Sequence, residues 1–403
     1  MALAAVLSLA TRVWGQDVWT LTSADFTQTR AAVLSFDDQT VRIRTVAGET
    51  QVIGWDRLLE LDRGGGASSS GRAAGSASGL TLVRVNDDRI TGVPVALVDE
   101  SLEWETAFGP MRVPLRDVLR VEAPGSAAVV PDRPAEQDVV QLANGDRLAG
   151  VIDSLDGRAL RLSVAGEVMA LPWDAVSVVQ LAGAAVSQRA AADGVPPRAF
   201  RVSLLGDSRL TVRSVAMVGD QLKLVDADSG ERSVPLKTVL AVEQLHGPVL
   251  WLTALSPVEA THTPYFAQLS LPPRMDRGAA RDGPIRSVEG DRPARAGVGM
   301  ASASRVTWNL PAGGYAAFRG QAVIDGNLPY ANVVLRVLLD DKVAWEQADF
   351  TSASPPATVL LPLSGARKLT LEVDYGKTLD VQDRVNWVEP ALLRTLPTTQ
   401  PGG

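Results

Sequence analysis

The sequence predicts an all-β protein in which repeated small β-barrel or β-sheet units precede a β-sandwich. Short segments of alternating apolar and polar residues are separated by turn residues, and one segment of this kind recurs along the chain. The 35 glycines and 25 prolines favour many turns over long helices. With 403 residues, the chain is long enough for several domains with a sizeable core.

Composition excludes several classes of function. The 39 Lys and Arg residues against 46 Asp and Glu give a net charge of −7, which disfavours a nucleic-acid binder because such a protein needs a basic face. There is no cysteine, and His246 and His262 are the only histidines. Disulfides and thiolate chemistry are therefore excluded, little remains for a histidine metal site, and we expect neither a metal nor a cofactor.

The amino terminus has the features of an export signal. Residues 2–10 form an apolar run with the length of a signal-peptide core, and small residues follow at Ala10 and Gly15. Against this, no basic residue precedes the run and Arg12 follows it, so a mobile tail or a first buried segment is the alternative. We expect residues 1–15 to be a signal peptide and the protein to be exported to the periplasm, the cell envelope or the medium. No stretch reaches the roughly 18 apolar residues of a membrane-spanning helix.

One segment recurs four times. AGEVMALPWDAVSVVQL (165–181) matches SGERSVPLKTVLAVEQL (229–245), and FGPMRVPLRDVLRVE and AGETQVIGWDRLLELD repeat the same ending. Trp55, Leu115, Trp173 and Leu236 are then equivalent, with spacings of 60, 58 and 63 residues. We name the predicted units 1 (16–63), 2 (80–122), 3 (138–182) and 4 (199–246).

Each unit is expected to contain about five short strands. Asn144-Gly145 is typical of a hairpin turn, and Leu160-Arg161-Leu162 alternates as a half-buried strand does. The closing Pro-(Trp/Leu)-x-x-Val predicts a short turn before the last strand. The result is a small bent sheet or barrel that resembles Sm-like barrels. The sequence leaves open whether the units are separate or pair edge to edge.

The tryptophans of these units are expected to pack in the core, because Trp55 and Trp173 have leucines as equivalents. Residues 64–79 are a Gly/Ser linker, and residues 123–137 and 183–198 are connectors.

Residues 249–396 have the pattern of a β-sandwich. Val306, Trp308 and Leu310 alternate with polar residues, and residues 333–339 do the same before a tight turn at Asp340-Asp341. Residues 397–403 are expected to be a disordered tail.

This part of the chain resembles the NPCBM module, a carbohydrate-binding module seen beside family 98 glycoside hydrolases and in many planctomycete secreted proteins. The residues that carry the resemblance occur in the order of the family: Gly297 to Leu310, Tyr315 with Phe318, Val323-Ile324-Asp325, Val334 to Asp341, Ser364-Gly365, Leu369-Thr370-Leu371, Asp383, Asn386-Trp387 and Pro390-Ala391-Leu392. The resemblance implies a galactose-binding-like jelly-roll sandwich with a glycan site in its loops. In one departure, Gly299-Met300-Ala301 has alanine where the family commonly has histidine.

Sugar binding needs an exposed aromatic face and a few polar groups for hydroxyls. The predicted binding residues are Tyr315, Asp325, Asn327, Tyr330, Trp345 and Asp383, and Tyr375 and Asp340 were further candidates. Each has a structural alternative: Asp325 could cap a turn, and Asp383 could anchor the loop before Trp387. Trp308 and Trp387 are expected in the core.

No enzyme is predicted. Glu103 and Glu105 flank Trp104, and Asp340 adjoins Asp341, but such carboxylates are usually solvated, and the motifs of serine hydrolases, P-loop proteins and zinc proteases do not occur. The leading hypothesis is a non-catalytic exported protein that binds a polysaccharide or glycan. The alternative is a structural or protein-interaction module of the cell envelope, with envelope proteins as partners, whose sandwich has lost sugar binding, as Ala301 suggests.

Overall fold

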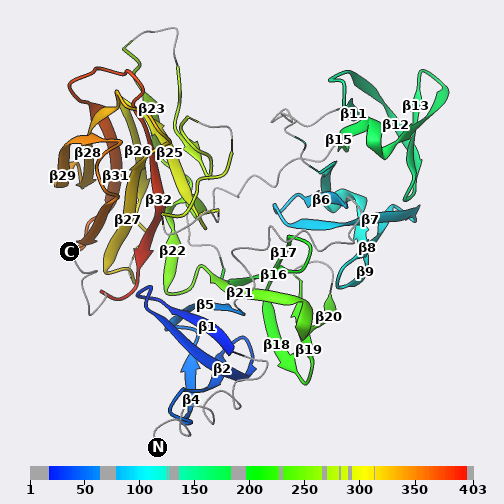
Figure 1. Ribbon diagram of the computed structural model, residues 1–403, viewed down its shortest axis with the longest axis horizontal. Coiled ribbons are helices and arrows are strands. Elements are labelled where there is room, and N and C mark those ends of the chain that lie inside the picture. The colour runs from blue at the N-terminus through cyan, green and yellow to red at the C-terminus, as the bar shows by residue number, and fades with distance from the viewer. Residues whose placement is uncertain are drawn as a thin grey trace, which may run out of the picture.

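A computed structural model describes residues 18–63, 79–124, 126, 136–182, 197–226, 230–265, 270–280, 283–288, 293–312 and 314–396. The expected signal peptide (1–15), nearly all of the linker (64–79), most of both connectors and the tail (397–403) lie outside these residues. The described residues form strands and one-turn 3₁₀ helices, arranged as four small sheet units and one sandwich (Figure 1). The all-β fold class is confirmed.

The four units contain strands where the alternating patterns predict them. In units 1 and 2 the elements are β1 (Val18–Ser23), β2 (Gln28–Phe36), β3 (Thr40–Arg44), β4 (Thr50–Gly54), β5 (Leu58–Asp62), β6 (Leu80–Arg84), β7 (Arg89–Val98), β8 (Ser101–Thr106), β9 (Gly109–Pro114), η1 (Leu115–Asp117) and β10 (Val118–Glu122). In units 3 and 4 they are β11 (Asp138–Leu142), β12 (Arg147–Leu155), β13 (Ala159–Val164), β14 (Glu167–Pro172), η2 (Trp173–Ala175), β15 (Val176–Gln180), β16 (Ala199–Leu204), β17 (Ser208–Val212), β18 (Ser214–Val218), β19 (Gln221–Val225), β20 (Glu231–Pro235), η3 (Leu236–Thr238) and β21 (Val239–Leu245).

Strand pairing follows one pattern in all four units. The first strand of each pairs with the second and with the last, as β1 does with β2 and β5, and β16 with β17 and β21. The turns also follow the sequence: Gly145 has a φ of +94°, and the Asn144 Oδ1 atom accepts a hydrogen bond from the Asp146 backbone N–H at 3.0 Å. The Pro-(Trp/Leu)-x-x-Val segments of units 2, 3 and 4 form the one-turn helices η1, η2 and η3 before the last strand.

The units pair edge to edge through their last strands. β5 of unit 1 pairs with β21 of unit 4, and β10 of unit 2 pairs with β15 of unit 3. Leu61 lies opposite Val242, and Val121 lies opposite Val179. Within its own unit, each of these four residues follows the repeated Trp or Leu (Trp55, Leu236, Leu115 or Trp173) at the same spacing. Both pairs are therefore joined by the same surface used twice, as in a two-fold symmetric dimer.

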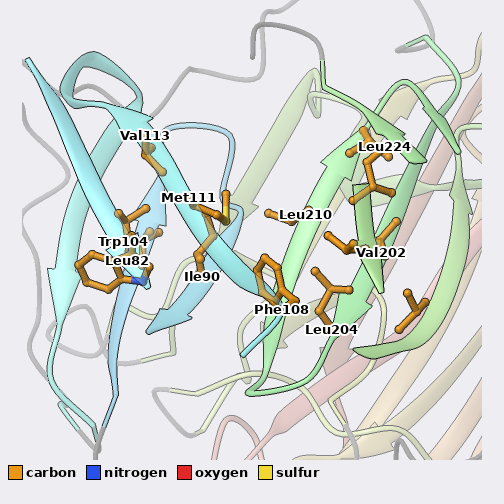
Figure 2. Close-up of a cluster of buried hydrophobic side chains, with 14 of the residues drawn as sticks. Leu82, Ile90, Trp104, Phe108, Met111, Val113, Val202, Leu204, Leu210 and Leu224 are labelled. Carbon is orange, nitrogen blue, oxygen red and sulfur yellow. The ribbon is translucent and has the colours of Figure 1, made fainter. Parts of the chain in front are cut away.

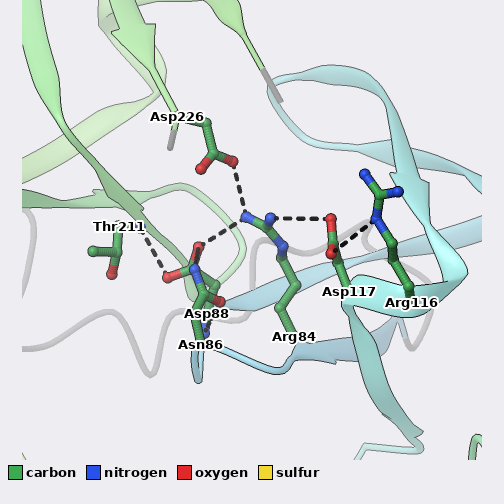
Figure 3. Close-up of polar contacts among 7 residues, drawn as sticks. All are labelled: Arg84, Asn86, Asp88, Arg116, Asp117, Thr211 and Asp226. Carbon is green, nitrogen blue, oxygen red and sulfur yellow. Dashed lines mark hydrogen bonds and ion pairs between the residues drawn. The ribbon is translucent and has the colours of Figure 1, made fainter. Parts of the chain in front are cut away.

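Units 2 and 4 also contact each other. Phe108 extends from the β8–β9 turn of unit 2 toward Leu204 and Leu210 of unit 4, and all of them belong to one continuous core (Figure 2). Beside it, the buried Arg84 guanidinium of unit 2 contacts Asp88 at 3.2 Å and Asp226 of unit 4 at 2.9 Å (Figure 3). The four units thus form one packed assembly and not separate beads.

The carboxy-terminal region is a sandwich of two antiparallel sheets. One sheet has the order β24-β25-β32-β27-β30 with β22 on β32, and the other has the order β23-β26-β31-β28-β29. Trp308, Phe318, Phe350 and Trp387 are fully buried between them, which confirms that Trp308 and Trp387 are core residues. The elements are β22 (Val249–Trp251), η4 (Leu252–Ala254), β23 (Glu259–His262), β24 (Arg274–Met275), β25 (Gly297–Ala301), β26 (Ser304–Asn309), β27 (Ala317–Ile324), β28 (Asn332–Leu339), β29 (Lys342–Thr351), β30 (Ala357–Pro362), β31 (Lys368–Tyr375) and β32 (Arg384–Leu393).

One end of the sandwich is fixed to unit 1. Leu59 of unit 1 is buried with Trp251 and Leu393 of the sandwich, and Phe26 packs against Trp251 with ring centroids 6.1 Å apart. Close by, Glu60 of β5 and Glu243 of β21 lie directly opposite each other. Two carboxylates in that position repel unless a cation lies between them. The Arg295 side chain, which contacts both Glu60 and Glu243, supplies this cation.

Candidate functional site

The opposite end of the sandwich carries the candidate site. Because the start of β27 and the end of β32 pack on unit 1, the end of β27 and the start of β32 face away from it (Figure 1). Three segments meet there: the 325–331 loop between β27 and β28, the 376–383 loop between β31 and β32, and residues 263–265 after β23.

The first two loops are tied together by hydrogen bonds. The Tyr330 backbone N–H donates to Gln382 Oε1 at 3.1 Å, and the Asn332 N–H donates to Asp383 Oδ1 at 2.9 Å. In return, the Lys377 N–H donates to Asn332 Oδ1 at 3.0 Å. The loops therefore have a fixed relative position, which a binding surface built on loops requires.

Asp383 lies beneath this surface and not on it. Its side chain is 0% exposed, and the Ser302 Oγ–H donates to Asp383 Oδ2 at 2.9 Å. Burial raises the pKa of Asp383 to about 6, and the bonds from Asn332 and Ser302 only partly offset that rise. The structural alternative weighed for this residue, that it anchors the loop, is the one that its contacts favour.

Large side chains are exposed at both ends of the 376–383 loop. Tyr330 is 64% exposed beside Gln382, and Tyr265 is 54% exposed beside Tyr375, with ring centroids 6.3 Å apart in an edge-on contact. The Tyr375 hydroxyl donates to the Thr263 carbonyl, which fixes this second tyrosine pair to β23. In the sequence between Tyr375 and Gln382, the loop exposes Leu379 and Val381. This end thus exposes two aromatic side chains, and the loop that contacts both of them exposes two apolar ones.

Charged groups lie near Tyr375. Arg384 donates from Nη1 to the Asp383 carbonyl at 2.9 Å, and Asp380 acts electrostatically on both Tyr375 and Arg384. His262 contacts the Ser302 carbonyl at 3.2 Å through Nε2. Burial, followed by the charge of Arg384, lowers the pKa of His262. Its imidazole is therefore neutral near pH 7.

Asp325 and Asn327 lie in the same loop as Tyr330. Asp325 is half-buried and its Oδ2 atom accepts a hydrogen bond from the Ala280 N–H at 2.6 Å, so one oxygen is already used. The next residue, Gly326, has a φ of +95°, and the turn leaves Asn327 exposed. Asn327 is thus available to a ligand, while Asp325 connects this loop to residues 270–280.

The other predicted residues are not brought to this end. Tyr315 precedes β27 at the end near unit 1, and the Arg394 guanidinium lies 5.1 Å from its ring centroid. Trp345 is half-buried on β29 and packs edge-on against Trp387 at 6.3 Å. Asp340 forms the predicted tight turn with Asp341, both at positive φ, and accepts hydrogen bonds from the N–H groups of Arg367 and Lys368.

Sequence reasoning missed Tyr265, Asp380 and Arg384. Tyr265 lies in a Thr-Pro-Tyr-Phe segment, well before the first alternating segment of the predicted sandwich. The pairing of β23 with β26 brings this segment to the sandwich end. A tyrosine that follows a proline in a polar segment was the available signal.

Ala301, the departure from the family pattern, is 3% exposed and lies opposite Arg384 in the β25–β32 ladder. The position therefore lies under the charged part of the surface. Among the described residues, no cluster of three or more histidine, aspartate or glutamate side chains is placed to hold a metal ion. No helix in the described part of the chain is long and apolar enough to cross a membrane.

Comparison with protein families gives a match in the carboxy-terminal region. Residues 249–393 match the NPCBM/NEW2 domain family. No curated protein matches the chain. Solved structures are also similar to it, and three of them are described here. The CBM51 module of Clostridium perfringens GH95 in complex with methyl-galactose is 19% identical, with 36% of this chain and 99% of that chain covered and a TM-score of 0.31.

The other two are larger. The tandem CBM51 modules of Sp3GH98, the family 98 glycoside hydrolase from Streptococcus pneumoniae SP3-BS71, are 12% identical, with 81% of this chain and 91% of that chain covered and a TM-score of 0.32. The CBM51-2 and INT domains of Clostridium perfringens ZmpB are 17% identical, with 45% and 37% covered and a TM-score of 0.32, so this chain spans little more than a third of that one. The NPCBM/NEW2 domain family is thus the one that residues 249–393 match, a range that spans the sandwich.

Proposed function

We propose that the protein is a non-catalytic, exported glycan-binding protein that holds sugar on the loop surface between Tyr265 and Tyr330. The observation that carries this proposal is the placement of two exposed tyrosines at the two ends of one loop. The backbone of Tyr330 is hydrogen-bonded to that loop, and the ring of Tyr265 packs on Tyr375. An aromatic face stacks on the C–H groups of a sugar ring, and this contact needs rings that are both exposed and fixed.

Sugar binding also requires polar groups that bind the hydroxyls, and such groups lie beside the tyrosines. Asn327 is exposed on the Tyr330 side, while Asp380 and Arg384 lie on the Tyr375 side. Amide, carboxylate and guanidinium groups provide both acceptors and donors for sugar hydroxyls. Because the surface is open, a single site of this kind binds weakly, and affinity for a polysaccharide comes from repeated contacts.

Export and the role of the units are further parts of the proposal. The apolar run at residues 2–10 supports export, as in the planctomycete secreted proteins that carry this module. We infer from the repeated sequence and strand pairing that units 1 to 4 are copies of one unit. They form a scaffold that presents the sandwich with its Tyr330 end outward.

The second candidate function is an envelope module that binds protein and not sugar. Ala301 in place of the usual histidine is the observation that favours it. Pull-down from an envelope fraction after enzymatic removal of glycans separates the two: partners that are retained favour the second candidate, and their loss favours the first.

Glycan binding is tested by affinity electrophoresis of the full chain through gels that contain different polysaccharides, after a glycan array has selected them. Tyr330→Ala and Tyr265→Ala are each expected to weaken the retardation about fivefold, because each removes one stacking contact of roughly 1 kcal/mol. Tyr315→Phe, at the other end of the sandwich, is the control and should leave it unchanged. Absence of retardation by any glycan, with the fold intact by circular dichroism, would contradict the proposal.

A further inference from the structure

A cavity of about 310 Å³ lies between units 2 and 3, away from the sandwich. Its walls are mostly apolar. Three pairs of equivalent residues line it, one member of each pair from each unit: Leu97 and Leu155, Leu115 and Trp173, Val121 and Val179. The cavity therefore lies on the approximate two-fold axis that relates the two units, at the ladder between β10 and β15.

In the other pair of units, aromatic side chains occupy the equivalent place. Trp55 of unit 1, the equivalent of Leu115 and Trp173, is fully buried, and Phe200 of unit 4 packs edge-on against it with ring centroids 5.1 Å apart. Trp173 makes the same anchoring bond as Trp55, from its indole N–H to a carbonyl of the preceding turn, but it is only half-buried. The expectation that both tryptophans are core residues thus holds fully for Trp55 alone.

The strand register explains the difference. Phe200 lies two residues before Val202, the residue of β16 that pairs with Val242. The equivalents of Val242 are Leu61, Val121 and Val179, and their partners in the first strands of units 1, 2 and 3 identify the same position there. The position carries Trp19 in unit 1 and Phe200 in unit 4. It carries Leu80 in unit 2 and Asp138 in unit 3. The pair formed by units 2 and 3 therefore lacks both aromatic rings that fill the other pair.

We propose that this cavity binds a small aromatic molecule with about two fused rings, which takes the place of the missing rings and contacts the Trp173 face. An apolar cavity of about 150 Å³ accommodates benzene, so one of twice that volume fits a two-ring ligand. Protein interiors rarely leave such a volume unfilled. The backbone pairing between units 2 and 3 is the same as that between units 1 and 4. The cavity is therefore due to the side chains that differ between the two pairs of units.

The polar groups of the lining fit a neutral ligand. Both carboxylate oxygens of Asp138 are already used: Oδ2 accepts from the Ile152 N–H at 2.9 Å and Oδ1 from the Ala182 N–H at 2.8 Å. Arg116 is 80% exposed, and its Nε atom is 3.8 Å from Asp117 Oδ1. Neither group needs a charged partner inside the cavity. Recognition then rests on shape and ring contacts.

Isothermal titration of the full chain with indole tests the proposal, and 1-octanol serves as a linear apolar probe. Indole is expected to bind at a ratio of one to one. Leu115→Trp fills the cavity with the residue that units 1 and 3 carry at this position, so indole binding should weaken about tenfold or more. The matched control is Leu205→Trp, the same change at an exposed turn of unit 4, which should leave binding unchanged.

A second variant keeps the test independent of how Leu115→Trp folds. Phe200→Ala removes the ring that fills the equivalent place between units 1 and 4, and is expected to add a second indole site. The proposal is overturned if indole does not bind to the wild-type chain, if Leu115→Trp binds it equally well, or if octanol binds more tightly than indole.

Discussion

Replacing Arg295 by methionine is expected to lower the free energy of unfolding by roughly 3–5 kcal/mol, because it leaves buried carboxylates without their cation. The Arg295 side chain is 9% exposed. It contacts Glu60 of unit 1, Glu243 of unit 4 at 3.7 Å and Glu389 of the sandwich at 3.2 Å. One guanidinium thus joins three parts of the molecule. Urea unfolding followed by tryptophan fluorescence measures the change.

The matched control is Arg305→Met. Arg305 also pairs with a glutamate, Glu372, at 3.0 Å, but its side chain is 45% exposed. Water already solvates such a pair, so the loss should be under about 1 kcal/mol. Equal effects of the two substitutions would show that Arg295 does not join the sandwich to the units. Partial recovery in Arg295→Met with Glu60→Gln and Glu243→Gln would identify repulsion between the carboxylates as the cause.

The sequence predicted the strands well, because many strands have one buried face and one solvent-facing side. Apolar and polar residues therefore alternate along them. Leu160-Arg161-Leu162 lies in β13 with both leucines buried and the arginine exposed, and residues 333–337 of β28 alternate between buried and half-buried. The alternation ends at a register shift between Val337 and Leu338, after which Leu338 is buried and Leu339 half-buried. Local turn chemistry was equally readable: Asp340 and Asp341 take the positive φ values that the tight turn requires. These features depend on residues that are close in the sequence.

Contacts between distant segments were not predictable in this way. Arg295 lies in a charged, proline-containing stretch typical of a linker, and nothing local shows that Glu60, more than 200 residues earlier, lies beside it. The pairing of the units depends on an edge-strand match that alternation does not encode. For the same reason, sequence reasoning named Tyr330 and Asn327 at the sandwich end but missed Tyr265, which long-range pairing of β23 brings there.

Unfolding free energy is expected to fall as pH rises from about 5 to about 7.5. Burial raises the pKa of Asp88 and of Asp383 to about 6 and also raises the pKa of Glu60. A carboxyl whose pKa is higher in the folded state stabilises the fold when protonated, and this contribution is lost as pH rises through the folded pKa. Each of the two aspartates then contributes roughly 3 kcal/mol at low pH, of which about 1.4 kcal/mol remains at pH 5.

Other groups act in the opposite direction but mostly at other pH values. The carboxylates of Asp37 and Glu122 have lowered pKa values, so their stabilisation is lost only as pH falls below about 4. His262, with its lowered pKa, loses stability as pH falls below about 6.5 and offsets part of the trend. Three carboxyls against one imidazole leave a net gain in stability toward pH 5, which chemical denaturation at fixed ionic strength measures.

Asp383→Asn isolates one of these groups. The amide can keep both bonds, since its oxygen accepts from the Asn332 N–H and its nitrogen can donate to Ser302 Oγ. The variant should be at least as stable as the wild type at pH 7.5, because no buried charge remains, and its loss of stability between pH 5 and pH 7.5 should be smaller by about 1.4 kcal/mol. A variant with the same pH dependence as the wild type would show that Asp383 does not titrate in this range. Glycan retardation at pH 7.5 should be retained by the variant, because the loops that carry Tyr330 and Tyr265 keep their anchor.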